Sequence, residues 1–134
     1  MIVVDTTIIA SLYLENPHKQ EIEALLVKDS QWVAPMMWRS EFRNLLASHM
    51  HQGSIRLDEA LTIMAACEEL MERMEYKPTS PHVLSLVQVS GCSAYDCEYV
   101  AIARDLGTVL VTFDWNLLKS FPRITLTPSA FLAL

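Results

Sequence analysis

The stretch Ile2-Val3-Val4-Asp5 joins three consecutive apolar residues to an acidic one. A short, wholly apolar run of this kind is typical of a strand that is buried on both faces of a parallel sheet. Its carboxyl end is the place where open parallel sheets gather ligand-binding groups. Residues 108–113 form a second strand pattern, and Asp114 follows it. The sequence therefore predicts that Asp5 and Asp114 end two strands and can be neighbours.

Short apolar runs alternate with longer helical patterns along the rest of the chain. We expect strands at residues 2–4, 31–33, 108–113 and 124–126. We expect helices at residues 6–14, 17–27, 35–52, 58–74, 80–91 and 93–107, with single turns after residues 114 and 127. Asn16 and Asp58 are the expected caps of two of these helices. The alternation predicts an α/β fold in one domain, residues 1–134, around a mainly parallel sheet of four to five short strands.

The composition is that of a globular protein, because hydrophobic residues make up 51% of the 134 residues and charged residues 19%. No apolar run approaches the roughly 20 residues of a membrane span, and we expect a cytoplasmic protein. The net charge of −6 argues against a protein that grips nucleic acid mainly by neutralising phosphates regardless of sequence. The three cysteines and four histidines are scattered, which favours neither a disulfide framework nor a zinc site.

Two further acids lie at notable positions in the expected helices. Glu41 shares a helix face with Met37 and Leu45, which lie one turn away on either side. Asp96 lies in the first turn of its helix, shortly before the small-residue run 101–103 that lets the helix approach a sheet closely. A carboxylate on an apolar face needs a partner. Both positions are therefore candidates for a functional site.

Each of these acids also has an ordinary structural explanation. Asp5 and Asp114 are suitable caps for the helices that they precede. Asp96 is the acidic member of a capping box pattern. Glu41 can pack its stem at an edge while its carboxylate reaches water. These explanations account for the residues singly, and leave open why all four coincide with strand ends or apolar helix faces.

If the acids converge, their mutual repulsion requires neutralisation. Two carboxylates about 5 Å apart repel by about 3 kcal/mol at an effective dielectric constant near 20. Hard divalent cations prefer sites made only of oxygen ligands, and Mg²⁺ keeps waters available for substrate phosphates. Such a site is suited to hydrolysis of a phosphodiester bond. The pattern therefore predicts Mg²⁺ or Mn²⁺ at a nuclease site.

The sequence resembles the PIN domain family, and within it the VapC-type toxins of toxin–antitoxin pairs. The resemblance covers nearly the whole chain and is carried by four motifs in order. These are residues 2–7 (IVVDTT), Pro35 followed by Glu41 and Asn44, residues 93–103 (SAYDCEYVAIA) and residues 110–114 (LVTFD). It implies a three-layer α/β/α fold around the sheet. It departs from the usual pattern at Thr7 and at Trp115-Asn116, positions that bear on substrate choice more than on chemistry.

The resemblance implies that Asp5, Glu41, Asp96 and Asp114 are the catalytic and metal-binding residues of an endoribonuclease. Thr6 and Thr112 are implied as supporting residues; each is equally well explained as an ordinary β-branched residue of a strand or helix start.

The implied partners are an RNA substrate, a cognate antitoxin and a second copy of the chain in a homodimer. The antitoxin would lie in a groove and direct a basic side chain toward the acids. A stripe of five residues on the helix at 58–74 is either a docking surface for it or part of the core; the stripe comprises Ala60, Met64, Cys67, Met71 and Met74. Arg39 and Arg43 either face RNA phosphates or solvate their helix.

Two other functions remain to be compared with the nuclease. One is a catalytically inactive PIN-like module that binds RNA or protein, although such a module has no need to keep four mutually repelling acids. The other is a phosphatase with Asp5 as nucleophile, as in haloacid dehalogenases. That pattern requires a second aspartate two residues later, where this chain has Thr7.

Overall fold

The computed structural model describes residues 1–134, and a parallel sheet of five strands forms its centre. The strands lie in the order β3-β2-β1-β4-β5, and every neighbouring pair is parallel. Their bounds are β1 (Ile2–Val4), β2 (Trp32–Pro35), β3 (Glu75–Tyr76), β4 (Leu110–Val111) and β5 (Thr125–Leu126). The central strands β1, β2 and β4 are fully buried, which explains why their sequences are continuous apolar runs.

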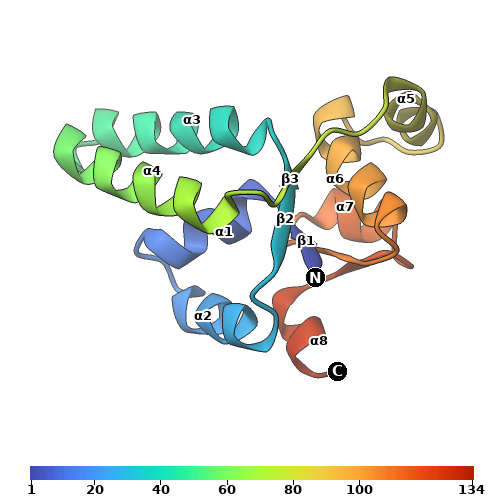
Figure 1. Ribbon diagram of the computed structural model, residues 1–134, viewed down its shortest axis with the longest axis horizontal. Coiled ribbons are helices and arrows are strands. Elements are labelled where there is room, and N and C mark those ends of the chain that lie inside the picture. Colours follow the sequence, from blue (N-terminus) through green and yellow to red (C-terminus); the bar gives the residue numbers. More distant parts are fainter.

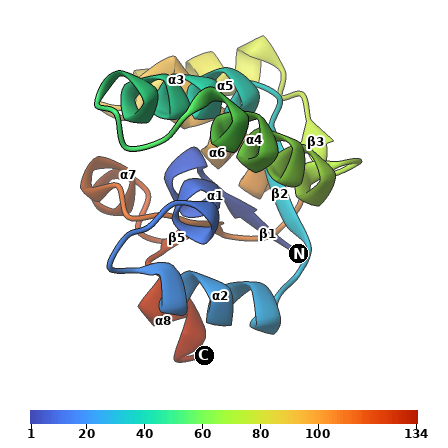
Figure 2. The same cartoon turned by 90° about the vertical axis from the view of Figure 1, so that its left-hand side faces the viewer.

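Eight helices surround the sheet in two layers. Their bounds are α1 (Thr6–Tyr13), α2 (Lys19–Lys28), α3 (Trp38–His51), α4 (Leu57–Met71), α5 (Ser80–Gln88), α6 (Ala94–Asp105), α7 (Trp115–Ser120) and α8 (Pro128–Leu132). Figure 1 shows α5, α6 and α7 on one side of the sheet, and α1, α3 and α4 on the other. Figure 2 shows α2 and α8 side by side beneath the sheet. This arrangement confirms the expected three-layer α/β/α fold.

Helix α6 has more buried residues than any other helix and places Asp96 at the site. It packs against β1, β2 and β4. Val100, Ala101, Ile102 and Ala103 are all buried, and the small alanines let the helix approach the sheet closely. Since the helix runs antiparallel to the strands that it covers, as in other parallel α/β folds, its first turn lies at their carboxyl ends.

Two strands differ from the sequence-based expectation. Strand β3 was not predicted, because Glu75 and Tyr76 form too short and too polar a run to be distinguished from the end of a helix. The predicted strand at residues 108–113 pairs as a ladder only at Leu110–Val111. Beyond it the backbone N–H of Thr112 still donates to Leu126 at 3.0 Å, and the chain then turns toward the acids.

Two expected helix caps are wrong. Asn16 accepts a hydrogen bond from the backbone N–H of His18 at 2.9 Å, which is an Asx turn, and α2 begins only at Lys19. The N-cap of α4 is Arg56, and Asp58 lies inside the first turn, where it pairs with the Arg56 guanidinium. Asn16 and Asp58 were expected to accept a hydrogen bond from a backbone N–H in the first turn of their helices. Each side chain is bonded to a different group instead.

An ion-pair network fastens the β3 edge to α3. Glu75 accepts from the indole N–H of Trp38 at 2.7 Å and from the Arg39 guanidinium at 2.8 and 2.9 Å. Arg39 also donates to Glu68 on α4 at 2.5 Å. Arg39 is therefore committed to structure, and neither of its expected roles, facing RNA or solvating the helix, is correct.

The methionine-containing stripe on α4 belongs to the core. Ala60, Cys67 and Met71 are buried, and Met64 and Met74 pack against the same hydrophobic cluster. The stripe is therefore not an exposed docking surface. None of the helices combines the length and apolar character that crossing a membrane would require.

Candidate active site

A pocket of about 240 Å³ holds all four of the predicted acids. Its lining residues are Asp5, Thr6, Thr7, Glu41, Asp96, Tyr99, Phe113 and Asp114. Asp5 follows β1, Asp114 follows β4 by two residues, Glu41 is in α3 and Asp96 is in α6. Residues that are up to 109 positions apart in the sequence thus share one cavity at the carboxyl edge of the sheet.

Asp5 and Asp114 are helix caps and pocket residues at the same time. Oδ1 of Asp5 accepts from the backbone N–H of Ile8 at 3.1 Å, and Oδ1 of Asp114 accepts from that of Leu117 at 3.1 Å. Capping occupies one oxygen of each carboxylate and fixes its orientation. The ordinary explanation is therefore correct for both residues, and it leaves Oδ2 of each for other partners.

Thr112 connects these two acids. Its hydroxyl donates to Oδ2 of Asp5, and its oxygen accepts from the backbone N–H of Asp114 at 2.9 Å. The Thr112 side chain is fully buried between β1 and the start of α7. One hydroxyl thus connects the Asp5 carboxylate with the backbone of Asp114.

Glu41 is held by two hydroxyl groups. Its Oε1 accepts from the Thr6 hydroxyl at 2.9 Å and from the Tyr99 hydroxyl at 2.6 Å. The two hydroxyl oxygens are themselves 2.8 Å apart. Thr6 and Tyr99 are both buried, so the bonds are shielded from competing water. Glu41 consequently presents Oε2 to the pocket.

Tyr99 is the pocket residue that sequence reasoning did not identify as functional. It lies in α6 three positions after Asp96, which places the two side chains on one helix face. That spacing could have indicated that Tyr99 lies near Asp96 and belongs to the pocket. It could not have indicated that the Tyr99 hydroxyl donates to Glu41, which lies on another helix.

Asp96 differs from the other three acids because its carboxylate accepts no hydrogen bond from the backbone or from another element. Ser93 caps α6 by accepting from the backbone N–H of Asp96 at 3.1 Å, and its hydroxyl also lowers the pKa of Asp96. The reciprocal bond of a capping box, from the Ser93 N–H to the Asp96 carboxylate, is not formed. The capping box therefore does not account for this carboxylate, which lines the pocket.

Burial and mutual repulsion make the pocket unfavourable for negative charge. Burial raises the pKa of Asp5 from 3.8 to about 6, against the effect of the Thr112 and Ile8 hydrogen bonds, and the charges of Asp114 and Glu41 add to the rise. The pKa of Asp96 is raised by burial first and then by Asp114 and Glu41. Burial and the neighbouring Glu41 also raise the pKa of the Tyr99 hydroxyl, which remains a proton donor at neutral pH.

These properties fit a hydrated divalent cation. No group of three or more acid, histidine or cysteine side chains already has the geometry of a complete ligand set. The carboxylates of the four acids instead line one cavity, and their oxygens are all hard donors. Mg²⁺ is commonly held by one or two carboxylates while it keeps several waters. The donor chemistry, together with charges that repel in the absence of a cation, matches such an ion.

Comparison with known proteins agrees with this geometry. The PIN domain family matches residues 2–123. The chain belongs to the PIN domain family. Ribonuclease VapC3 of Pyrobaculum aerophilum is 28% identical over 126 residues, which are 92% of this chain and 96% of that protein.

A solved structure shares the fold of this PIN domain. The crystal structure of PAE2754 from Pyrobaculum aerophilum matches with a TM-score of 0.74, at 19% sequence identity, over 98% of this chain and 93% of that one. The expected family is therefore confirmed. The assignment of individual residues to metal binding and catalysis stays a prediction.

The raised pKa of Asp5 predicts how the stability of the metal-free PIN domain depends on pH. The folded protein binds the Asp5 proton more tightly than the unfolded chain does, so deprotonation disfavours folding between pH 4 and pH 6. A rise from 3.8 to about 6 corresponds to about 3 kcal/mol of stability lost over that interval. We expect Asp5→Asn to remove this loss, so that its stability relative to the wild type increases from pH 4 to pH 7.5.

Urea unfolding in a chelating buffer at several pH values measures this difference. Asp58→Asn is the control, because Asp58 is exposed and the Arg56 guanidinium lowers its pKa. The explanation given for Asp5 is contradicted if the difference in unfolding free energy between Asp5→Asn and the wild type stays constant from pH 4 to pH 7.5.

Proposed function

We propose that this PIN domain is an endoribonuclease that depends on Mg²⁺ or Mn²⁺, and that it acts in the cytoplasm as the toxin of a toxin–antitoxin pair. The observation that carries the proposal is the single pocket formed by Asp5, Glu41, Asp96 and Asp114. The similarity to Ribonuclease VapC3 over nearly the full length of both chains supports RNA as the substrate.

The residues of the pocket have distinct roles in this proposal. Asp5, Glu41, Asp96 and Asp114 would hold the cation: Glu41, Asp96 and Asp114 each through an oxygen without a hydrogen bond, and Asp5 through a remaining lone pair, because both of its oxygens already accept a hydrogen bond. The chemistry that a divalent cation supplies in such a site is to make a water molecule more acidic and to offset negative charge on the leaving oxygen. Asp96, whose carboxylate accepts no backbone hydrogen bond, is the acid best placed to orient that water or to accept its proton.

The hydroxyl groups keep the carboxylates in position during the reaction. Thr112 holds Asp5 against the start of α7, and Thr6 and Tyr99 hold Glu41. All three hydroxyl-bearing residues are buried, and each hydroxyl is directed at a carboxylate. Thr6, Tyr99 and Thr112 are therefore positioning residues rather than catalytic ones.

Two exposed aromatic side chains that adjoin pocket acids in the sequence favour single-stranded RNA. Tyr95 directly precedes Asp96 and Trp115 directly follows Asp114, and their side chains are 66% and 72% exposed. Both rings are therefore available for stacking. Unpaired bases stack on aromatic side chains in many single-strand-binding proteins, whereas paired bases are inaccessible.

The proposed toxin role also implies two protein partners. The similarity to VapC-type proteins supports a cognate antitoxin that covers the acidic pocket with a basic side chain, which would compensate the same charges as the cation. It also supports a homodimer, for which the leucines on the exposed face of α4, Leu57 and Leu61, are candidate contact residues, with side chains 59% and 62% exposed.

Cleavage of a single-stranded RNA tests the proposed activity. We expect cutting in Mg²⁺ or Mn²⁺, none with excess chelator, and a fall in kcat of about 100-fold or more for Asp96→Asn, because the carboxylate that orients the ion and water is lost. Asp105→Asn is a matched control, since Asp105 lies on the same helix and faces His82 rather than the pocket. Equal cleavage by wild type and Asp96→Asn would exclude this pocket as the active site.

The stacking role of Trp115 predicts a separate effect on substrate binding. Trp115→Ala should raise KM for single-stranded RNA by about tenfold with little change in kcat, since one stacked base contributes about 1–3 kcal/mol. Trp115→Phe, which keeps a ring, should remain near the wild type. A lowered kcat with an unchanged KM in Trp115→Ala would contradict stacking as its role.

A further inference from the structure

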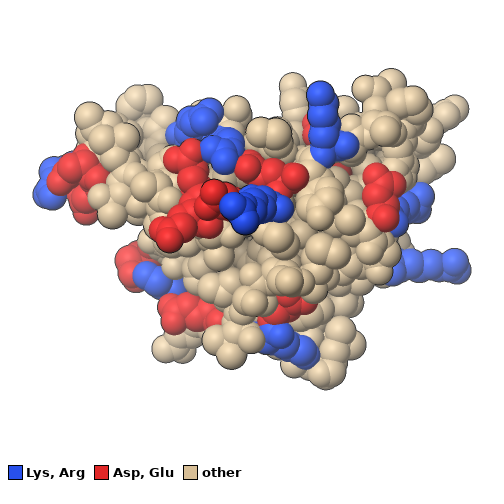
Figure 3. All heavy atoms as spheres, viewed as in Figure 1, with Lys and Arg blue, Asp and Glu red and all other residues tan.

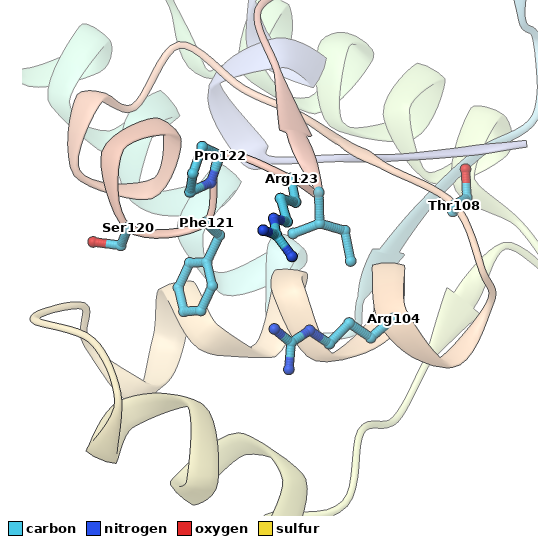
Figure 4. Close-up of a pocket in the computed structure, with 7 residues that line it drawn as sticks. Arg104, Thr108, Ser120, Phe121, Pro122 and Arg123 are labelled. Atoms are coloured by element: carbon cyan, nitrogen blue, oxygen red, sulfur yellow. The ribbon is translucent and has the colours of Figure 1, made fainter.

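A second hollow, of about 490 Å³, lies at the opposite end of the sheet from the acids. Its walls come from the last turn of α6, the turn before β4 and the loop between α7 and β5. Arg104, Ser120, Phe121 and Arg123 are among the residues that line it. Figure 4 shows the guanidinium groups of Arg104 and Arg123 turned toward the same space, with the ring of Phe121 beside them.

Neither of these arginines has a partner within the chain. The guanidinium groups of Arg104 and Arg123 make no hydrogen bond and no ion pair, and the Ser120 hydroxyl is also unbonded. By contrast, Arg39 and Arg56 are each paired with two carboxylates. Two like charges that face one hollow repel each other unless an anion lies between them. The hollow therefore has the charge and the donors of an anion site.

A purely structural role explains only half of this arrangement. Arg104 lies in the last turn of α6, where a cation interacts favourably with the helix dipole. Arg123 lies in a loop, with no helix end of its own to compensate. Its position opposite Arg104 is accounted for by a shared ligand. A guanidinium group offers a planar fork of N–H donors that matches the oxygens of a phosphate.

Two helices connect this hollow with the acidic pocket. Helix α6 carries Asp96 in its first turn and Arg104 in its last, eight residues later, which is about 12 Å at 1.5 Å per residue. Helix α7 begins after Asp114 and ends at Ser120. A stacked strand with a rise of about 3.4 Å per nucleotide covers that distance in roughly four nucleotides. A single RNA can therefore reach both places.

General charge attraction contributes little to RNA binding by this protein. The net charge is −6, and on the face shown in Figure 3 the lysine and arginine side chains lie scattered among acidic ones without a continuous basic surface. A site where two unpaired guanidinium groups face one hollow is therefore a more favourable place for a phosphate group than that face.

We propose that Arg104 and Arg123 bind a phosphate group of the RNA substrate several nucleotides away from the bond that is cut. This inference rests on the proposed ribonuclease function. The hollow is then an accessory substrate site, which sets a minimum length of RNA for tight binding and takes no part in the chemistry.

Binding of a labelled single-stranded RNA in a chelating buffer, where it is not cut, tests the proposal. Arg104→Gln and Arg123→Gln should each weaken binding about tenfold. Each should also reduce the slope of log affinity against log salt, by about 0.7 if one phosphate contact is lost. Arg104→Lys should retain the slope because it keeps the charge.

Arg73→Gln is the matched control for charge. Arg73 is exposed and lies just before β3, at the other edge of the sheet, and it makes no ion pair. The Arg73→Gln variant should bind RNA with the same affinity and salt dependence as the wild type. The proposal is overturned if Arg104→Gln and Arg123→Gln bind RNA with wild-type affinity and salt dependence, or if Arg73→Gln loses as much affinity as they do.

Two further measurements separate this proposal from its alternatives. In Mg²⁺, the variants should cut a dinucleotide at the wild-type rate and show a raised KM only for longer RNA. If the wild-type protein cuts neither the dinucleotide nor the longer RNA, the ribonuclease function is refuted. The binding measurement in chelating buffer then still decides whether Arg104 and Arg123 bind RNA. Calorimetry with inorganic phosphate is the second. Phosphate binding that depends on Arg104, combined with unchanged RNA affinity in the variants, would assign the hollow to a free anion and overturn the proposal.

Discussion

Electrostatic repulsion among half-buried carboxylates is the constraint on which the rest of this structure depends. Asp5, Glu41, Asp96 and Asp114 face one cavity, and the pKa of Asp5 and of Asp96 is raised by burial and further by the charges of Asp114 and Glu41. The fold keeps them together by fixing one oxygen of Glu41 and of Asp114 and both oxygens of Asp5, through the caps of α1 and α7 and through the Thr6, Tyr99 and Thr112 hydroxyls. In the proposed function a cation would bind the remaining lone pairs, and its charge would offset the repulsion.

The sequence predicted the acids well because motif and position agree there. Asp5 and Asp114 follow apolar strands, and the strand order brings those two strands into direct contact. Tyr99 and the exact extent of the strands were not predictable in the same way. A hydroxyl that reaches from α6 to Glu41, or a strand as short as Glu75–Tyr76, depends on contacts between distant segments, which local patterns do not encode.

The same limit applies to the arginines. Arg39 and Arg43 were considered for RNA because they lie close to Glu41 in sequence, yet Arg39 is bound by Glu68 and Glu75. Arg104 and Arg123 have no motif, are 19 residues apart and meet only because α6 and the loop after α7 end at the same place. The fold thus separates two groups of side chains: carboxylates at the carboxyl ends of the strands, and unpaired guanidinium groups at their other ends.

The central claim is that the four carboxylates together bind one or more divalent cations, and anomalous diffraction from crystals soaked in Mn²⁺ tests it most directly. The account predicts a manganese peak inside the cavity, within ligand distance of at least one of Asp5, Glu41, Asp96 and Asp114, with further contacts through water. The account would be contradicted if crystals that bind Mn²⁺ elsewhere show no peak in this cavity. It would also be contradicted if the four carboxylates point away from one another.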